Sequence, residues 1–204
     1  MAVRVIIPPE PIVTPAEIAG TSSDDDAAVK RMISAATRTI DGPSGWLGRA
    51  LGKQTIELTG WLGCHRRFRL PYPPIIKIVS VSAEDCDRNE VPVDADTWRQ
   101  DGDEIVISHG ASWVREPVHR IRYEAGYDGV DVDAGGTGPV PDEAKQAIIL
   151  MVQHMRAVGT ENLFLRSVEV HDVITKQYTI SDKAGALIQR AVENLLSGIR
   201  IYSC

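Results

Sequence analysis

The sequence predicts an α+β fold: a small bundle of three to four helices with an inserted antiparallel β subdomain and extended terminal arms. Two observations carry this prediction. Apolar residues recur at helical spacing at 24–41, at 141–158 and again after residue 181. Between residues 52 and 124 the period changes to two, which is typical of strands. A strand pattern enclosed by helix patterns indicates a β insertion between helices.

The segment 141–158 has the most apolar helical sequence in the chain. Pro141 suits the first turn of a helix, and Asp142 and Glu143 favour the positive end of the helix dipole. The apolar run from Ile148 to Val152 covers a whole turn, which indicates burial on most sides, either in the core or at a seam between subunits. The residues that we predict at such a seam are Ile149, Leu150, Val152 and Met155.

The N-terminal part of the chain predicts an arm followed by two helices. Residues 1–13 contain prolines and a short β-branched run, so we expect an extended arm rather than a packed element. The sequence from Thr14 to Glu17 is a capping box, which predicts a short helix over 14–20. A longer helix is predicted over 24–41, because acidic and hydroxyl side chains precede its apolar stripe and a Gly-Pro pair follows it.

The insertion at 52–124 is predicted to be a small antiparallel β subdomain. Its segments are rich in β-branched residues, and the prolines of 71–74 interrupt any regular ladder. The predicted strands are 54–58, 68–70, 75–81, 97–100, 104–108 and 118–124. Together with the helices at 14–20, 24–41 and 141–158, this insertion gives a core domain of residues 14–160.

Residues 161–204 are predicted to add a hairpin, a last helix and a tail. The stretch from Leu165 to Ile180 alternates well enough for a long hairpin, and Ser181 with Asp182 caps a helix with an apolar stripe. After Gly198 the chain continues as an extended tail.

Composition narrows the class of protein. The 204 residues are enough for one ordinary domain with extensions, and the net charge of −6 argues against a protein that grips nucleic acid by its phosphates. No apolar run is long enough to span a membrane, and no signal peptide is present, so we expect a product of the cytoplasm. The odd number of cysteines, Cys64, Cys86 and Cys204, argues against a disulfide framework.

The sequence contains no pattern that predicts catalysis or a cofactor. The five histidines are scattered without metal-ligand spacing, and no nucleophile motif is present. Residues 131–142 resemble a calcium-binding loop only faintly, because Gly135 occupies a ligand position and prolines follow, so an ordinary loop is favoured. We therefore expect a protein that is not an enzyme and that binds no metal or cofactor.

Basic residues cluster once, at 65–69. On a strand, Arg67 and Arg69 share one face, where they would form a short cationic stripe for an acidic partner or a DNA phosphate. A solvated sheet face is the favoured interpretation.

Several short segments resemble a known family. The sequence from Tyr123 to Tyr127, a variable loop, and then Val140 with Pro141 opening the helix AIILMVQHM resemble the phage head-tail connector proteins, also called adaptor or head-completion proteins. The branch that they resemble carries a β-rich insertion between its helices. The stretches 48–51 and 191–202 resemble the family's bridge into the first strand and its C-terminal helix.

This resemblance implies a structural protein of the virion, assembled in the host cytoplasm. It implies a ring of twelve copies beneath the portal of a tailed phage or a gene transfer particle, which extends the DNA channel and docks the next ring or the tail. The implied partners are the portal protein, a stopper or tail-terminator protein and other copies of the chain, whereas DNA passes without sequence-specific binding and no membrane is involved. The portal contact is expected at Ile199, Arg200, Ile201 and Tyr202 and at the hairpin.

Two alternatives stay open at this point. The chain could be a tail terminator or stopper ring of the same particle, which would bind a different partner. It could also be a soluble enzyme or regulatory module in which the same order of elements arises by coincidence.

Overall fold

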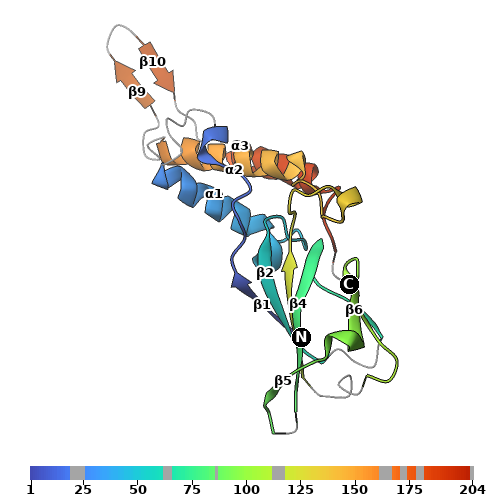
Figure 1. The fold of residues 1–204 in the computed structure, drawn as a ribbon. Coiled ribbons are helices and arrows are strands. Elements are labelled where there is room, and N and C mark those ends of the chain that lie inside the picture. Colours follow the sequence, from blue (N-terminus) through green and yellow to red (C-terminus); the bar gives the residue numbers. More distant parts are fainter. Residues whose placement is uncertain are drawn as a thin grey trace. The chain divides into compact units, whose positions relative to one another are not determined.

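The computed structural model describes residues 1–18, 26–61, 66–85, 87–111, 118–160, 167–170, 174–177 and 182–202. Three α-helices and antiparallel sheets make up these residues, which confirms the predicted α+β class (Figure 1). The chain divides into two compact units: the first comprises Met1–Ile12, Arg38–Val140 and Arg200–Cys204, and the second comprises Val13–Thr37 and Pro141–Ile199. The cysteines Cys64, Cys86 and Cys204 lie outside the described residues.

The first unit contains a five-stranded antiparallel sheet with the strand order β1-β2-β8-β4-β5. The strand β8 lies in the middle and pairs with β2 on one side and with β4 on the other. The strand bounds are β1 (Ala2–Ile7), β2 (Gln54–Gly60), β4 (Ile75–Glu84), β5 (Glu90–Pro92) and β8 (His119–Ala125). The sequence predicted all of these strands except β1 and the very short β5.

Residues 1–13, which we expected to form an unpacked arm, belong to this sheet through β1. The strand is extended as predicted, but it pairs with β2, where Val3 lies opposite Leu58 and Arg4 lies opposite Glu57. Val3 also packs against the core. The prolines on which the expectation rested follow the strand, so their missing N–H groups leave the ladder intact.

A three-stranded sheet completes the first unit, with the order β3-β7-β6. Its strands are β3 (Arg67–Arg69), β6 (Trp98–Asp101) and β7 (Glu104–Ile107). Apolar side chains of both sheets form one core, in which Ile56, Tyr123 and Ile105 are fully buried. The Tyr123 hydroxyl donates a hydrogen bond to the carbonyl oxygen of Pro71 at 2.9 Å, so its one polar group is satisfied, and burial raises the pKa of this tyrosine well above its ordinary value.

The opposite face of β8 carries ion pairs instead of apolar side chains. The alternation along the strand buries Ile121 and Tyr123 and turns Arg122 and Glu124 outward. The Arg122 Nε lies 2.8 Å from a carboxylate oxygen of Glu57 on β2. Because the two faces differ so strongly, a slip of one residue in the register of β8 would bury charges, which fixes the pairing.

A buried carboxylate ties the end of α1 (Ala27–Ile40) to the start of β2. The Asp41 carboxylate accepts hydrogen bonds from the backbone N–H of Leu51 at 2.6 Å, from the N–H of Gly52 at 3.3 Å and from the side-chain amide of Gln54 at 3.1 Å. Asp41 is only 4% exposed. Burial raises its pKa to about 6, although these hydrogen bonds act in the opposite direction.

The second unit contains most of α1 together with α2 (Asp142–Thr160) and α3 (Asp182–Leu196). The α1 helix begins at a cap, because the Oδ1 atom of Asp26 accepts the backbone N–H groups of Ala28 and Val29. The helices α2 and α3 pack so closely that a Cβ atom added at Gly185 would lie 3.7 Å from the His154 ring. Within the described part of the chain, every helix is too short or too polar to cross a bilayer.

Two predicted elements differ in extent from the observed ones. The helix expected over 14–20 is a single 3₁₀ turn, Pro15–Glu17, which Glu17 stabilises by accepting the backbone N–H of Thr14 at 2.6 Å. The hairpin expected from Leu165 to Ile180 contains β9 (Ser167–Val170) and β10 (Ile174–Gln177), which pair antiparallel. Residues 19–20 of the first range, and the residues of the second range outside these two strands, lie outside the described residues.

Candidate partner-binding surfaces

The C-terminal residues predicted to bind a partner are fixed to the loop that follows α1. The backbone N–H of Ile201 donates a hydrogen bond to the carbonyl oxygen of Leu47 at 2.9 Å. Leu47 is fully buried and Ile201 is half-buried, whereas Arg200 and Tyr202 are exposed. The tail therefore has one tethered residue with an exposed residue on either side of it.

The exposed residues of the tail form an aromatic-cationic stack. The guanidinium carbon of Arg200 lies 5.0 Å from the centroid of the Trp46 ring and 4.6 Å from the centroid of the Tyr202 ring. Both distances are within the range at which a guanidinium is attracted to the face of an aromatic ring. We call Trp46, Arg200 and Tyr202 the arginine stack.

The loop approaches the tail closely because Gly48 has no side chain. Gly48 has a φ of +71°, in the left-handed region, and a Cβ atom added there would lie 2.3 Å from the carbonyl oxygen of Ile201. Any other residue would have to displace the tail.

Sequence reasoning found the tail but not the loop that holds it. Ile199, Arg200, Ile201 and Tyr202 were predicted together from the extended pattern after α3. Trp46 and Leu47 were not singled out, because they are about 150 residues away in sequence and no local pattern links them to the tail. The only local signal in the sequence is a tryptophan between Gly45 and Gly48.

The four residues predicted at a subunit seam on α2 have different environments. Ile149, Leu150 and Met155 are half-buried in the single chain. Val152 is fully buried within the chain, so it offers no surface to a neighbouring subunit. The helix period places Val152 on the same stripe as Ala144 and Ile148, which are also fully buried.

The glycine-rich loop between β8 and α2 is internally hydrogen-bonded. The Asp128 carboxylate accepts the backbone N–H groups of Val130 and Thr137, each at 3.0 Å, and the Thr137 hydroxyl accepts the N–H of Asp128 at 3.0 Å. Burial alone would raise the pKa of Asp128, but the hydrogen bonds from Thr137 and Val130 outweigh it and lower that pKa. This loop holds Val132 in an exposed position at 70%.

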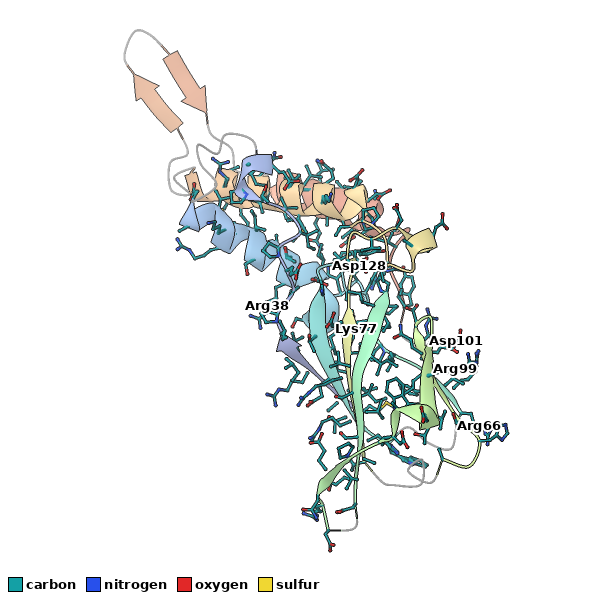
Figure 2. All side chains as sticks on the ribbon, viewed as in Figure 1. Arg38, Arg66, Lys77, Arg99, Asp101 and Asp128 are labelled. Carbon is teal, nitrogen blue, oxygen red and sulfur yellow. The ribbon has the colours of Figure 1, made fainter. Side chains whose placement is uncertain are left out.

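Two arginines of the basic cluster at 65–69, Arg67 and Arg69, are paired with carboxylates within the chain. Arg67 contacts Asp101 and lies 3.2 Å from a carboxylate oxygen of Glu104, and Arg69 lies 3.7 Å from Asp103. Figure 2 places Asp101 on β6, beside Arg99. Arg67 and Arg69 share a face as predicted, but their charges are neutralised by neighbouring carboxylates, which agrees with a solvated sheet face.

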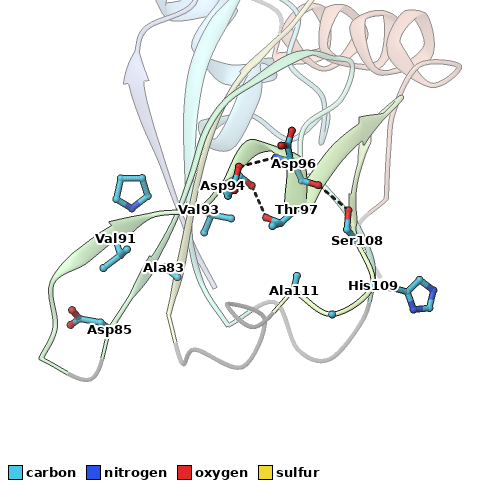
Figure 3. Close-up of a pocket in the computed structure, with 12 residues that line it drawn as sticks. Ala83, Asp85, Val91, Val93, Asp94, Asp96, Thr97, Ser108, His109 and Ala111 are labelled. Carbon is cyan, nitrogen blue, oxygen red and sulfur yellow. Dashed lines mark hydrogen bonds between the residues drawn. The ribbon is translucent and has the colours of Figure 1, made fainter.

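An open cavity of about 530 Å³ lies beside β5, between the two sheets of the first unit. Its apolar lining includes Val91, Val93 and Ala111. The polar groups at its edge bond to one another, since Asp94 accepts the N–H of Asp96 and the Thr97 hydroxyl bonds to the carbonyl oxygen of Asp94 (Figure 3). The Ser108 hydroxyl, which also lines the cavity, donates to the carbonyl oxygen of Asp96, so these polar groups are used by the loops that surround the cavity.

The described residues contain no group of three His, Cys, Asp or Glu side chains placed to hold a metal ion. Asp41 and Asp128 have shifted pKa values, but each is used by the backbone of its own loop. The candidate surfaces for binding a partner are therefore the arginine stack and the half-buried residues of α2.

The sequence matches no protein-family profile and no curated protein. Solved structures do match. A chain in the neck of an empty gene transfer agent (GTA) particle, computed with C6 symmetry, has a TM-score of 0.64 at 19% identity. The match covers 100% of this chain and 97% of that chain.

Two further structures give the same result. A chain in the neck of a native GTA particle, computed with C12 symmetry, has a TM-score of 0.62 at 20% identity, and a chain in the virion of a native GTA particle has a TM-score of 0.63 at 21% identity. Each match covers 100% of this chain and 97% of the other. At such low identity the likeness shows a shared fold.

Proposed function

We propose that this chain is a structural subunit of the neck of a tailed phage or of a phage-derived gene transfer particle. Within that neck it acts as the adaptor, a ring beneath the portal that extends the DNA channel and docks the next ring or the tail. The observation that carries the proposal is the fold shared with GTA neck chains over 100% of this chain and 97% of those chains. The resemblance of separate sequence segments to head-tail connectors points in the same direction.

The ring is proposed to contain twelve copies. The symmetries of the compared necks, C12 and C6, are compatible with twelve subunits or with pairs of subunits in a sixfold arrangement. Contacts between copies would use the half-buried apolar residues of α2, namely Ile149, Leu150 and Met155. Identical subunits that meet head to tail form a closed ring when the rotation between them closes.

The charge of the chain suits a conduit. A net charge of −6 repels a duplex and lets it slide, whereas a protein that grips DNA needs a basic surface. In the basic cluster at 65–69, Arg67 and Arg69 are already paired with carboxylates. DNA would therefore pass through the ring without sequence-specific binding.

The portal contact is proposed at Ile199–Tyr202 and at the β9–β10 hairpin. The tail combines an exposed tyrosine with an exposed arginine, and both residue types are enriched at the energetic centres of protein interfaces. Because its backbone is tethered to Leu47, it loses little conformational freedom on binding.

The test is the molar mass of the purified protein by light scattering, alone and mixed with the portal ring of the same particle. We expect a complex whose mass corresponds to one portal ring and twelve copies of this chain. A chain that does not bind the portal but binds the tail tube would be a stopper or tail terminator. A monomer that binds no neck or tail component would contradict a neck function.

A further inference from the structure

We propose that Arg200 is an anchor for a carboxylate side chain of the partner ring, and that Trp46 and Tyr202 hold it in position to bind one. This inference rests on the proposed portal contact and names the chemistry of that contact. The partner surface would present an aspartate or glutamate to the edge of the guanidinium group.

The geometry of the arginine stack leaves the hydrogen-bond donors of Arg200 available. A guanidinium is planar, and its five N–H donors point outward within that plane. The rings of Trp46 and Tyr202 cover the guanidinium near its central carbon, at 5.0 and 4.6 Å. A ligand that approaches along the edge meets two parallel donors, which match the two oxygens of a carboxylate.

Four other arginines of the first unit, Arg67, Arg69, Arg120 and Arg122, have carboxylate partners within the chain. Arg67 pairs with Asp101 and Glu104, and Arg122 pairs with Glu57. Among the described residues, Arg200 has aromatic neighbours and no carboxylate within ion-pair distance. What distinguishes Arg200 from an exposed arginine such as Arg99, which is unpaired in the described part of the chain, is that two aromatic rings hold it in place, which suits a group that binds a partner.

The position of the stack is set in advance of binding. The Ile201 backbone is tethered to fully buried Leu47, and Gly48 permits the close approach of the two segments. Trp46 is held in turn, because its backbone N–H donates to the carbonyl oxygen of Thr39 at 3.3 Å. An arginine that is fixed before binding loses less side-chain entropy when it meets its partner.

A carboxylate fits this site better than a DNA phosphate. A duplex presents a row of phosphates and is bound by several basic side chains together, whereas the stack contains one. The net charge of −6 also disfavours the approach of a duplex. Arginine, tryptophan and tyrosine are instead enriched among the residues that contribute most of the binding free energy at protein interfaces.

The experiment measures the affinity of the full-length chain for the purified portal ring of the same particle at low and high salt. Arg200→Gln should weaken binding by about tenfold to a hundredfold and flatten its salt dependence. Arg200→Lys should recover only part of the affinity, because lysine keeps the charge but loses the planar fork. Arg99→Gln, which removes an exposed arginine from β6, should bind like the natural protein.

Melting temperatures of all variants should agree, because Arg200 is exposed, and this keeps a folding defect from imitating a binding defect. Failure of the natural chain to bind the portal would overturn the proposed function and this inference with it. Portal binding that survives Arg200→Gln unchanged would overturn this inference alone. A short DNA duplex that binds the natural chain but not Arg200→Gln, with portal binding unaffected, would assign the site to phosphate instead.

Discussion

The backbone N–H of Ile201 donates a hydrogen bond to the carbonyl oxygen of Leu47, 2.9 Å away, so the end of the chain is part of the first unit. A segment that looks like a free tail in the sequence is thus an exposed surface with a fixed backbone. Because Gly48 follows Leu47 directly, the contact can be tested by changing a residue outside the tail.

Gly48→Ala should release the tail and destabilise the protein. The added methyl would lie 2.3 Å from the Ile201 carbonyl oxygen, and the φ of +71° costs any non-glycine residue additional strain. We expect the free energy of unfolding, measured by urea denaturation, to fall by roughly 2–3 kcal/mol. The tryptophan emission should also change, because Trp46 loses its contact with Arg200.

The matched control is Gly102→Ala in the turn between β6 and β7. Gly102 has a similar φ of +58°, but nothing lies within 4 Å of an added Cβ atom. The free energy of unfolding of Gly102→Ala should fall only by the cost of the left-handed backbone conformation, about 1 kcal/mol. If the free energy of unfolding fell equally in the two variants, the contact between the tail and the loop would contribute little to stability.

Asp41→Asn should change how stability depends on pH. Folding raises the pKa of Asp41 from 3.8 to about 6, so the folded state binds the proton more tightly than the unfolded state. The contribution of this group to stability is complete below about pH 4 and is lost as the pH rises through 6. Its loss between pH 4 and pH 7 amounts to roughly 3 kcal/mol.

Asparagine cannot ionise, so the variant should lack this loss. The free energy of unfolding of Asp41→Asn minus that of the natural protein should therefore increase from pH 4 to pH 7, whatever offset arises because one oxygen no longer accepts the N–H of Gly52. Asp133→Asn, measured in parallel, controls for the removal of one negative charge. A difference that does not vary with pH would contradict a raised pKa at Asp41.

The helices and strands with a clear period were predicted because the period depends only on residues that are neighbours in the sequence. The alternation of apolar Ile121 and Tyr123 with charged Arg122 and Glu124 predicts β8. Asp26, which caps α1, indicates where that helix begins. The strand β5 was missed because Glu90–Pro92 contains one apolar residue beside a proline, which argues against a strand in sequence.

The candidate site was predicted only in part, because it depends on contacts between distant residues. The tail could be recognised as an extended apolar and aromatic segment, whereas its contact with Trp46 follows from the tertiary fold. The subunit seam on α2 stays a prediction, although one of its four residues is buried within the chain. An apolar run around the whole helix does not say which side faces the chain's own core, and Val152 is on that side.

Asp128→Ala should loosen the loop between β8 and α2. The carboxylate accepts the backbone N–H groups of Val130 and Thr137, and water can replace it at least at the exposed Val130, so its removal should cost roughly 1 kcal/mol. Hydrogen exchange at these two amides should accelerate more than exchange in β8. Asp131→Ala, in the same loop, is the control, and comparable acceleration in that variant would show that Asp128 has no special role.

Replacing apolar residues on α2 should separate assembly from folding. Leu150→Glu places a charge on a half-buried position of the proposed seam, so ring formation should be lost while the melting temperature of the monomer changes little. Val152→Ala removes buried volume instead and should lower the free energy of unfolding by about 2 kcal/mol. Rings that Leu150→Glu forms normally, as judged by light scattering with the portal present, would move the subunit interface away from this helix.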